Sequence, residues 1–281
     1  MPLNPMTRRP VHALARSHAV ARLRAVAQLR RAGCGALATA IACITLAAQE
    51  PVLLRDPKTK DLFNSARIAI FGGPGGIARL QGLRFKGRSR FAGSGDDLIS
   101  ATVEIRVLLP DRFLRSDTGS FGRRQIGYAG DTSLDRMESA TGHITPDSRS
   151  AAAVLQADRS ELARLMLGTA MYASQEVPMK LQTRDTPIDM PGLPEALGID
   201  ATGETFAARI AFDGKSHLPV RIVFWSGDRT VRTSAFSDRR NVGGMQVPYA
   251  IVTTAGDRIV DELMFDEVTV NPPLTANDFR R

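Results

Sequence analysis

Apolar residues recur at three- and four-residue steps between residues 57 and 71, and this spacing predicts an amphipathic helix. The apolar stripe consists of Leu62, Phe63, Ala66 and Ile70. Asp56 stands before Pro57, which is typical of a helix start, because the carboxylate accepts hydrogen bonds from free N–H groups and proline fits the first turn. Gly72 follows the last apolar position, so the helix is predicted to end there.

From residue 77 onward the apolar period changes to two, which predicts β-strands. The clearest alternation consists of Val103, Ile105, Val107 and Leu109, followed by a turn at Pro110. Further strand-like runs are 206–212, 220–224, 229–236, 246–254 and 258–270. The turns between the later runs are too short for the crossovers that parallel strands need. The sequence therefore predicts an antiparallel meander.

A second amphipathic helix interrupts the predicted sheet. Its start is assigned to the polar stretch 158–161, and 135–150 and 186–195 are interpreted as loops around it. The apolar positions of this helix are Leu162, Leu165, Met166 and Ala170. Because a helical stripe and a one-sided strand both need a dry partner, we expect the two helices to cover the apolar face of the sheet.

The first 48 residues have the composition of a secretory signal peptide. They hold seven arginines and no acidic residue, and they end in a short apolar run of small residues, 33–48. The mature protein is expected to begin near Ala48 or Gln49 and to lie in the periplasm. Cleavage would remove seven of 37 basic residues and none of 29 acidic ones, so the formal charge would fall from +8 to +1. The high charge of the whole chain therefore does not indicate nucleic-acid binding.

Both cysteines, Cys34 and Cys43, lie inside this leader, so the mature chain is expected to have no disulfide. The stretch 40–43 loosely matches the small-residue pattern before a lipid-modified cysteine. Anchoring through Cys43 is thus the alternative to a free periplasmic protein. Residues 49–281 are expected to form one domain, with a helical insertion around 131–203.

No catalytic or metal-binding motif emerges from the mature sequence. His143 and His217 lack partners at the spacing of zinc ligands, and the glycine cluster 72–76 lacks the Lys-Ser/Thr of a phosphate loop. Four acidic residues near the C-terminus are interpreted as a solvated strand face. They are Asp261, Glu262, Asp266 and Glu267. We therefore expect no enzyme, cofactor or metal site. A hydrolase would need a buried pair of polar side chains within hydrogen-bonding reach in a cleft.

Four segments carry a resemblance to a known family. They are 103–115, 218–222, 236–248 and 265–279. In this order they resemble secreted bacterial proteins of the lipoprotein-carrier superfamily (LolA/LolB-like, LppX/LprG-like), which includes the outer-membrane lipoprotein-sorting proteins. The resemblance implies an α+β fold in which a strongly curved antiparallel sheet, an unclosed barrel, has helices over its concave face. It implies a ligand with acyl chains and no catalytic residues.

The alternation of each strand and the stripe of the second helix define a candidate hydrophobic cavity. Its predicted ligand-binding residues are Val103, Ile105, Val107, Leu162, Leu165, Met166, Phe206, Ile210, Phe212, Ile222 and Phe224. If these side chains leave space between them, the protein is a non-enzymatic carrier for lipid, a lipoprotein acyl chain or another amphiphile, and a protein of the inner or outer membrane is an expected partner. If they fill the space, it is a structural or adaptor domain of the cell envelope. The cavity volume beneath the sheet discriminates between these two readings.

Overall fold

A computed structural model describes residues 52–54, 56–93, 97–145, 148–173, 177–183, 196–225 and 230–280. The predicted signal peptide, 1–48, and the predicted loop 186–195 lie outside these described residues. In the described part, fifteen strands form one sheet. The strands are β1 (Val52–Leu54), β2 (Gly82–Ala92), β3 (Leu98–Leu108), β4 (Arg112–Gly119), β5 (Gly122–Ala129), β6 (Thr132–Ser133), β7 (Arg136–Ser139), β8 (Ile144–Thr145), β9 (Met179–Thr183), β10 (Leu197–Thr202), β11 (Ala207–Phe212), β12 (Pro219–Trp225), β13 (Arg232–Val242), β14 (Met245–Ala255) and β15 (Arg258–Val270).

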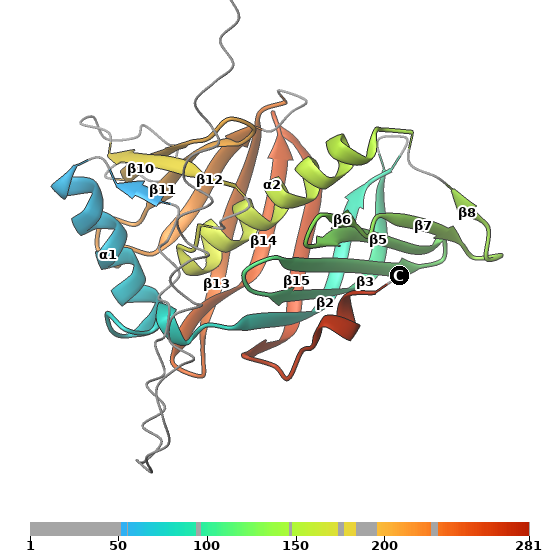
Figure 1. The fold of residues 1–281 in the computed structure, drawn as a ribbon, viewed down its shortest axis with the longest axis horizontal. Helices are drawn as coiled ribbons and strands as arrows, with labels where there is room; N and C mark the ends of the chain where they lie inside the picture. Colours follow the sequence, from blue (N-terminus) through green and yellow to red (C-terminus); the bar gives the residue numbers. More distant parts are fainter. Residues whose placement is uncertain are drawn as a thin grey trace, which may run out of the picture. The chain divides into compact units, whose positions relative to one another are not determined.

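The sheet is antiparallel except at one edge, where β1 pairs in parallel with β9. Its order is β1-β9-β10-β11-β12-β13-β14-β15-β2-β3-β4-β5-β7-β8, with β6 paired to β5. The predicted meander is confirmed from β11 to β15, where each strand pairs with the next, and β10, which the sequence did not predict, extends it by one strand. Because β1 and β8 form two separate edges, the sheet does not close into a barrel (Figure 1). This confirms the predicted α+β class with an unclosed, curved antiparallel sheet.

Helix α1 (Pro57–Phe71) begins and ends where the sequence predicts. The side chain of Asp56 accepts a hydrogen bond from the backbone N–H of Thr59 at 2.7 Å, and Gly72 ends the helix in the left-handed conformation. The predicted stripe is buried, with Phe63 1% and Ile70 0% exposed. Local capping and amphipathicity therefore fix this helix.

Helix α2 (Ala151–Ala170) begins seven residues before the predicted start. The N-cap is Ser150, whose hydroxyl accepts a hydrogen bond from the backbone N–H of Ala153 at 3.3 Å. Three alanines with high helix propensity then form the first turn, and this favours the early start over the polar stretch 158–161. The prediction that 135–150 is only a loop is also wrong, because β7 and β8 pair there as a hairpin.

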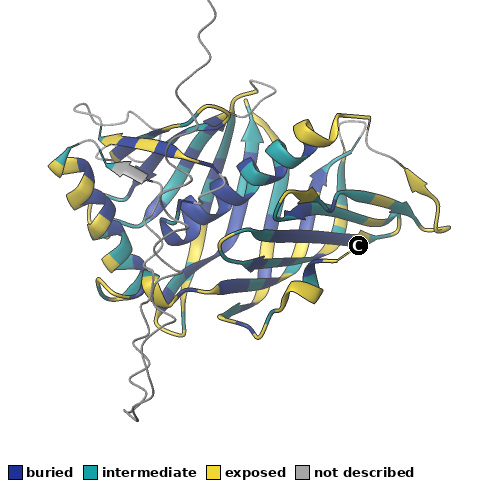
Figure 2. Ribbon diagram, in the orientation of Figure 1, coloured by how far each residue is buried: buried dark blue, intermediate teal, exposed yellow. Residues whose placement is uncertain are grey.

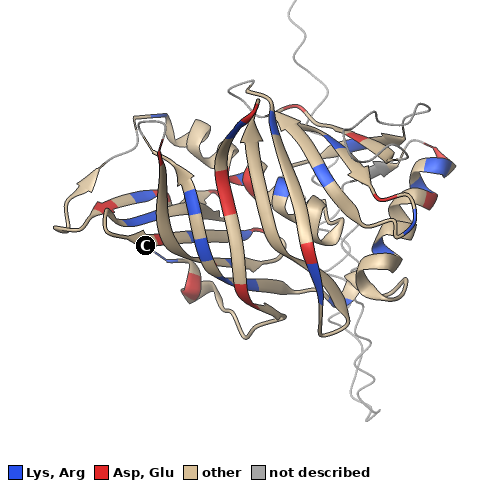
Figure 3. Ribbon diagram, turned by 180° about the vertical axis from the view of Figure 1, so that it is seen from behind, with Lys and Arg blue, Asp and Glu red and all other residues tan. Residues whose placement is uncertain are grey.

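Helix α2 crosses the concave side of the sheet (Figure 1), and its burial changes along its length (Figure 2). Residues 162–170 are all buried, whereas the N-terminal turns carry exposed and half-buried positions. The buried half joins α1 and the inward faces of the strands in one continuous hydrophobic core. Charged positions lie on neighbouring strands of the outward face (Figure 3). Arg84 forms an ion pair with Glu267, and Arg88 forms one with Asp266. Of the helices in the described residues, none has the length and apolar character needed to cross a bilayer.

Candidate binding pocket

A cavity of ≈790 Å³ lies between the N-terminal half of α2 and the concave side of the sheet. The helix contributes positions at three- and four-residue steps, so they share one face. They are Ala153, Gln156, Ala157, Ser160, Glu161 and Arg164, and Asp158 lines the cavity beside them. These side chains are small or polar, in contrast to the apolar stripe of the buried half. The space therefore remains open where the helix stops presenting large apolar residues.

At the cavity, the inner faces of β4 and β15 change from apolar to charged side chains. On β4, Phe113 is buried in the core, and the next two positions on the same face are Arg115 and Asp117. On β15 the inward face runs from Leu263 to Asp261. The inner face of the sheet is thus apolar at one end and charged at the other, and the cavity lies over the charged end.

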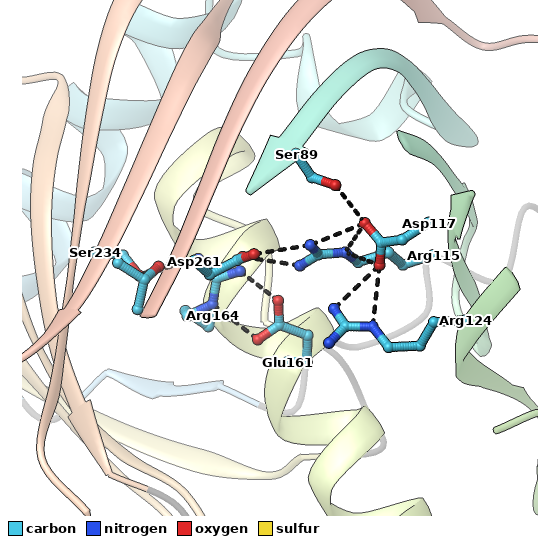
Figure 4. A network of polar contacts seen from close by, with 9 residues as sticks. Ser89, Arg115, Asp117, Arg124, Glu161, Arg164, Ser234 and Asp261 are labelled. Atoms are coloured by element: carbon cyan, nitrogen blue, oxygen red, sulfur yellow. Dashed lines mark hydrogen bonds and ion pairs between the residues drawn. The ribbon is translucent and has the colours of Figure 1, made fainter. Parts of the chain in front are cut away.

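Arg115 is the centre of this charged network (Figure 4). Its Nη1 and Nη2 each donate to an Asp261 oxygen at 2.8 Å, and its Nε donates to Asp117 Oδ2 at 3.0 Å. Ser89 Oγ donates to Asp117 Oδ1 at 2.7 Å. Arg115 is 3% exposed and Asp117 is 0% exposed. Buried charges persist only when paired and hydrogen-bonded, and both conditions are met here.

The pKa shifts follow from this arrangement. Burial acts to raise the pKa of Asp117, but the positive charges of Arg115 and Arg124 hold it below the usual range. Burial acts to lower the pKa of Arg115, and the charges of Asp261 and Asp117 raise it above the ordinary value. The pairs therefore stay ionised at neutral pH.

A second pair ties α2 to the sheet. Arg164 donates from Nε and Nη2 to the carboxylate of Glu161, and from Nη1 to the hydroxyl of Ser234 on β13 at 3.1 Å. Ser234 in turn contacts Thr253 on β14, with 2.8 Å between the hydroxyl oxygens. Burial opposes ionisation of Glu161, but the charge of Arg164 lowers its pKa below the ordinary value. Arg164 thus spans the cavity wall between helix and sheet (Figure 4).

Arg124 on β5 lies at the edge of the network. Its Nε and Nη2 both donate to Asp117 Oδ2, at 3.2 and 3.0 Å, and its guanidinium lies 3.7 Å from the centre of the Phe91 ring. Among the described residues its third nitrogen, Nη1, has no hydrogen-bond partner. The side chain is held in place by the ring and the carboxylate together.

A pair of carboxyl groups, Asp135 and Asp158, also lines the cavity. Asp158 on α2 is 1% exposed and interacts with Asp135, which accepts a hydrogen bond from the backbone N–H of Gly127 at 2.9 Å. Ser133 Oγ donates to Asp158 Oδ2 at 3.2 Å. Burial, together with the charge and hydrogen bond of Asp135, raises the pKa of Asp158 to about 9. The two groups therefore share one proton at neutral pH.

All eleven sequence-predicted residues lie in the main hydrophobic core, which also contains the stripe of α1, and each is no more than 5% exposed. Only Phe224 also lines the cavity. Whether the other ten contact a ligand stays a prediction.

Sequence reasoning missed the charged residues that line the cavity, because their partners lie on other strands. For Asp261 the interpretation as a solvated strand face is wrong. This side chain faces inward, at 17% exposed, whereas Asp266 and Glu267 are 66% and 54% exposed as predicted. The local signal was the alternation Asp261, Leu263, Phe265, which places the carboxylate on the same face as two core residues.

Within the described residues, no group of three or more His, Cys, Asp or Glu is placed to hold a metal ion. The Asp135–Asp158 pair is the arrangement that a hydrolase would require. A substrate would, however, have little access to Asp158, and its carboxyl is engaged with Ser133 of β6 and with Asp135 just after that strand. The chemistry that the cavity offers best is non-covalent binding through arginines and a partly apolar wall.

No family model and no curated protein matches this sequence. Among solved structures, the chain is similar to a LolA superfamily protein from Nitrosomonas europaea, with 11% identity and a TM-score of 0.49 over 79% of this chain and 97% of the other. It is also similar to an outer membrane lipoprotein-sorting protein domain from Vibrio parahaemolyticus, with 10% identity and a TM-score of 0.49 over 79% and 96%. A DUF1329 family protein from Desulfovibrio piger shares 9% identity with a TM-score of 0.49 over 79% and 97%.

Proposed function

We propose that this protein is a non-enzymatic periplasmic binding or carrier protein for an amphiphile such as a lipid or a lipoprotein acyl chain. The observation that supports this function is the cavity of ≈790 Å³ beneath the sheet. Its size falls in the range of about 300–1,000 Å³ that is usual for small-molecule sites. A domain that served only as a scaffold would have no need of this space.

The lining of the cavity fits an amphiphile better than a purely apolar ligand. Phe91, Ile126, Phe224 and Val260 offer an apolar wall, and the arginine network lies beside it. Each methylene buried against such a wall contributes roughly 0.8 kcal/mol. A short acyl segment with a polar end would therefore satisfy both parts of the lining.

A fluorescent fatty acid, dansylaminoundecanoate, tests this function by titration of the mature protein. Ala157→Trp places a large ring in the cavity, and Ala152→Trp makes the same change at an exposed position of α2 that does not line it. We expect saturable binding that Ala157→Trp weakens by about tenfold or more and Ala152→Trp leaves intact. The absence of saturable binding, or equal binding by both variants, would favour the packed scaffold or adaptor.

Export through the leader is part of the same proposal. We expect the protein recovered from the periplasm to begin near Ala48 or Gln49, and N-terminal sequencing checks this. A lipid-modified Cys43 at the mature terminus would instead make this an anchored lipoprotein. In either case a membrane protein that delivers or accepts the amphiphile is the expected partner.

A further inference from the structure

The cavity presents more positive than negative charge. Six arginines line it, against four carboxyl residues, and two of these, Asp135 and Asp158, hold one proton between them. Three negative charges therefore face six positive ones. Asp117 and Glu138 pair with lining arginines from outside the cavity.

The three arginines of the charged network, Arg115, Arg124 and Arg164, differ in how far carboxylates compensate their charge. Arg115 has two carboxylates and Arg164 has one, and these raise the pKa of both arginines despite burial. Arg124 has only Asp117, which Arg115 already shares. Burial and the positive charge of Arg115 lower the pKa of Arg124, so its cation is the least compensated of the three.

Arg124 is also placed to receive a ligand. It lines the cavity, its Nη1 has no partner in the described structure, and Phe91 and Asp117 hold its guanidinium still. A donor that is already oriented loses little conformational freedom when an anion arrives. Phe91 and Ile126 lie in the same lining and would contact an adjoining apolar chain.

We infer that Arg124 anchors an oxyanion, a carboxylate or a phosphate, at the polar end of the amphiphile that occupies this cavity. This inference rests on the proposed function and specifies its ligand class. Charge-assisted hydrogen bonds from a guanidinium favour such groups over a neutral hydroxyl, and the positive lining disfavours a cationic end.

Isothermal titration calorimetry with ligands that share a dodecyl chain tests the inference. The ligands are dodecanoate, dodecyl phosphate, dodecanol and dodecyltrimethylammonium, with inorganic phosphate as a chain-free anion. We expect the two anionic amphiphiles to bind about tenfold or more tightly than dodecanol, with dodecyltrimethylammonium weakest. Added salt should reduce the difference in affinity between the anionic amphiphiles and dodecanol, because salt screens charge–charge interactions.

Arg124→Gln is the test variant, and Arg123→Gln is its matched control. Arg123 is the neighbouring position on β5, points to the other face and is exposed. The preference for anions should disappear in Arg124→Gln and persist in Arg123→Gln, while Arg124→Lys should retain part of it. If Arg124→Gln does not fold, as judged by circular dichroism, the wild-type ligand series and Arg124→Lys still decide the question.

Two results would show that the ligand is not anionic and would still be compatible with the proposed function. Dodecanol could bind as tightly as dodecyl phosphate, or Arg124→Gln could keep the wild-type preference. Equal binding of inorganic phosphate and dodecyl phosphate would also contradict the inference, because the site would then serve a free anion. Failure of every dodecyl ligand to bind would instead refute the proposed function.

Discussion

Asp158→Asn should remove a pH dependence of stability that is built into the cavity wall. The Asp135–Asp158 pair keeps one proton in the folded protein up to a pKa of about 9, whereas the ordinary value for an aspartate is 3.8. Between these pH values the unfolded chain releases a proton that the folded chain retains. The folded state therefore loses about 1.4 kcal/mol of stability for each pH unit. The contribution is fully present below pH 3.8 and is lost as the pH rises toward about 9.

Asparagine matches aspartate in shape, and its amide donates a hydrogen bond at every pH, whereas the Asp158 carboxyl donates one only while it is protonated. Its amide can donate to Asp135, and its oxygen can accept from Ser133, so both contacts of Asp158 are kept. From pH 5.5 to 7.5 the free energy of unfolding of the wild type should fall by about 3 kcal/mol, and that of Asp158→Asn should not show this fall. The variant should therefore become the more stable protein as the pH rises.

Urea unfolding at pH 5.5, 6.5 and 7.5 measures this difference. Asp131→Asn is the matched control, because Asp131 pairs with Arg159 but its side chain is 95% exposed. The control should follow the wild-type pH profile. Parallel profiles for Asp158→Asn and the wild type would show that the Asp135–Asp158 pair does not hold a proton in the folded protein.

Three further substitutions test how the core and the network are held together. Leu165→Asp places a carboxylate at a side chain that is 1% exposed and does not line the cavity, so thermal unfolding should show a loss of several kcal/mol. Gly168→Ala would bring a methyl group to 2.0 Å from the Phe236 ring. The free energy of unfolding should therefore fall by about 1–3 kcal/mol, because this clash outweighs the higher helix propensity of alanine. Arg115→Met leaves Asp117 and Asp261 without their shared partner. Urea unfolding should show that the free energy of unfolding falls by about 3–5 kcal/mol. An unchanged free energy of unfolding would show that the network contributes nothing to the stability of the fold.

The sequence carries enough local information to specify α1 and the strands from β11 to β15. Capping by Asp56 and Gly72 and strict alternation act over a few residues, so one chain segment reveals them. The start of α2 was misplaced because a second polar stretch, 158–161, offers a local cap that the longer helix does not use.

The charged cavity could not be predicted in the same way. Arg115 meets Asp261 across 146 positions of sequence, and only the order of the sheet, in which β15, β2, β3 and β4 are neighbours, brings them together. Alternation does assign Asp261 to the inner face. A carboxylate is rarely buried without a partner, so the sequence alone favoured a solvent-exposed position for Asp261. Its partner, Arg115, is adjacent only in the folded structure.

Native mass spectrometry of the protein purified from the cell envelope would show whether the cavity beneath the sheet holds an amphiphile. We expect one bound amphiphile on the wild type and on Ala152→Trp, and none on Ala157→Trp. A wild-type protein that carries no ligand and takes up none from added lipid, or an equal load on both tryptophan variants, would contradict this expectation.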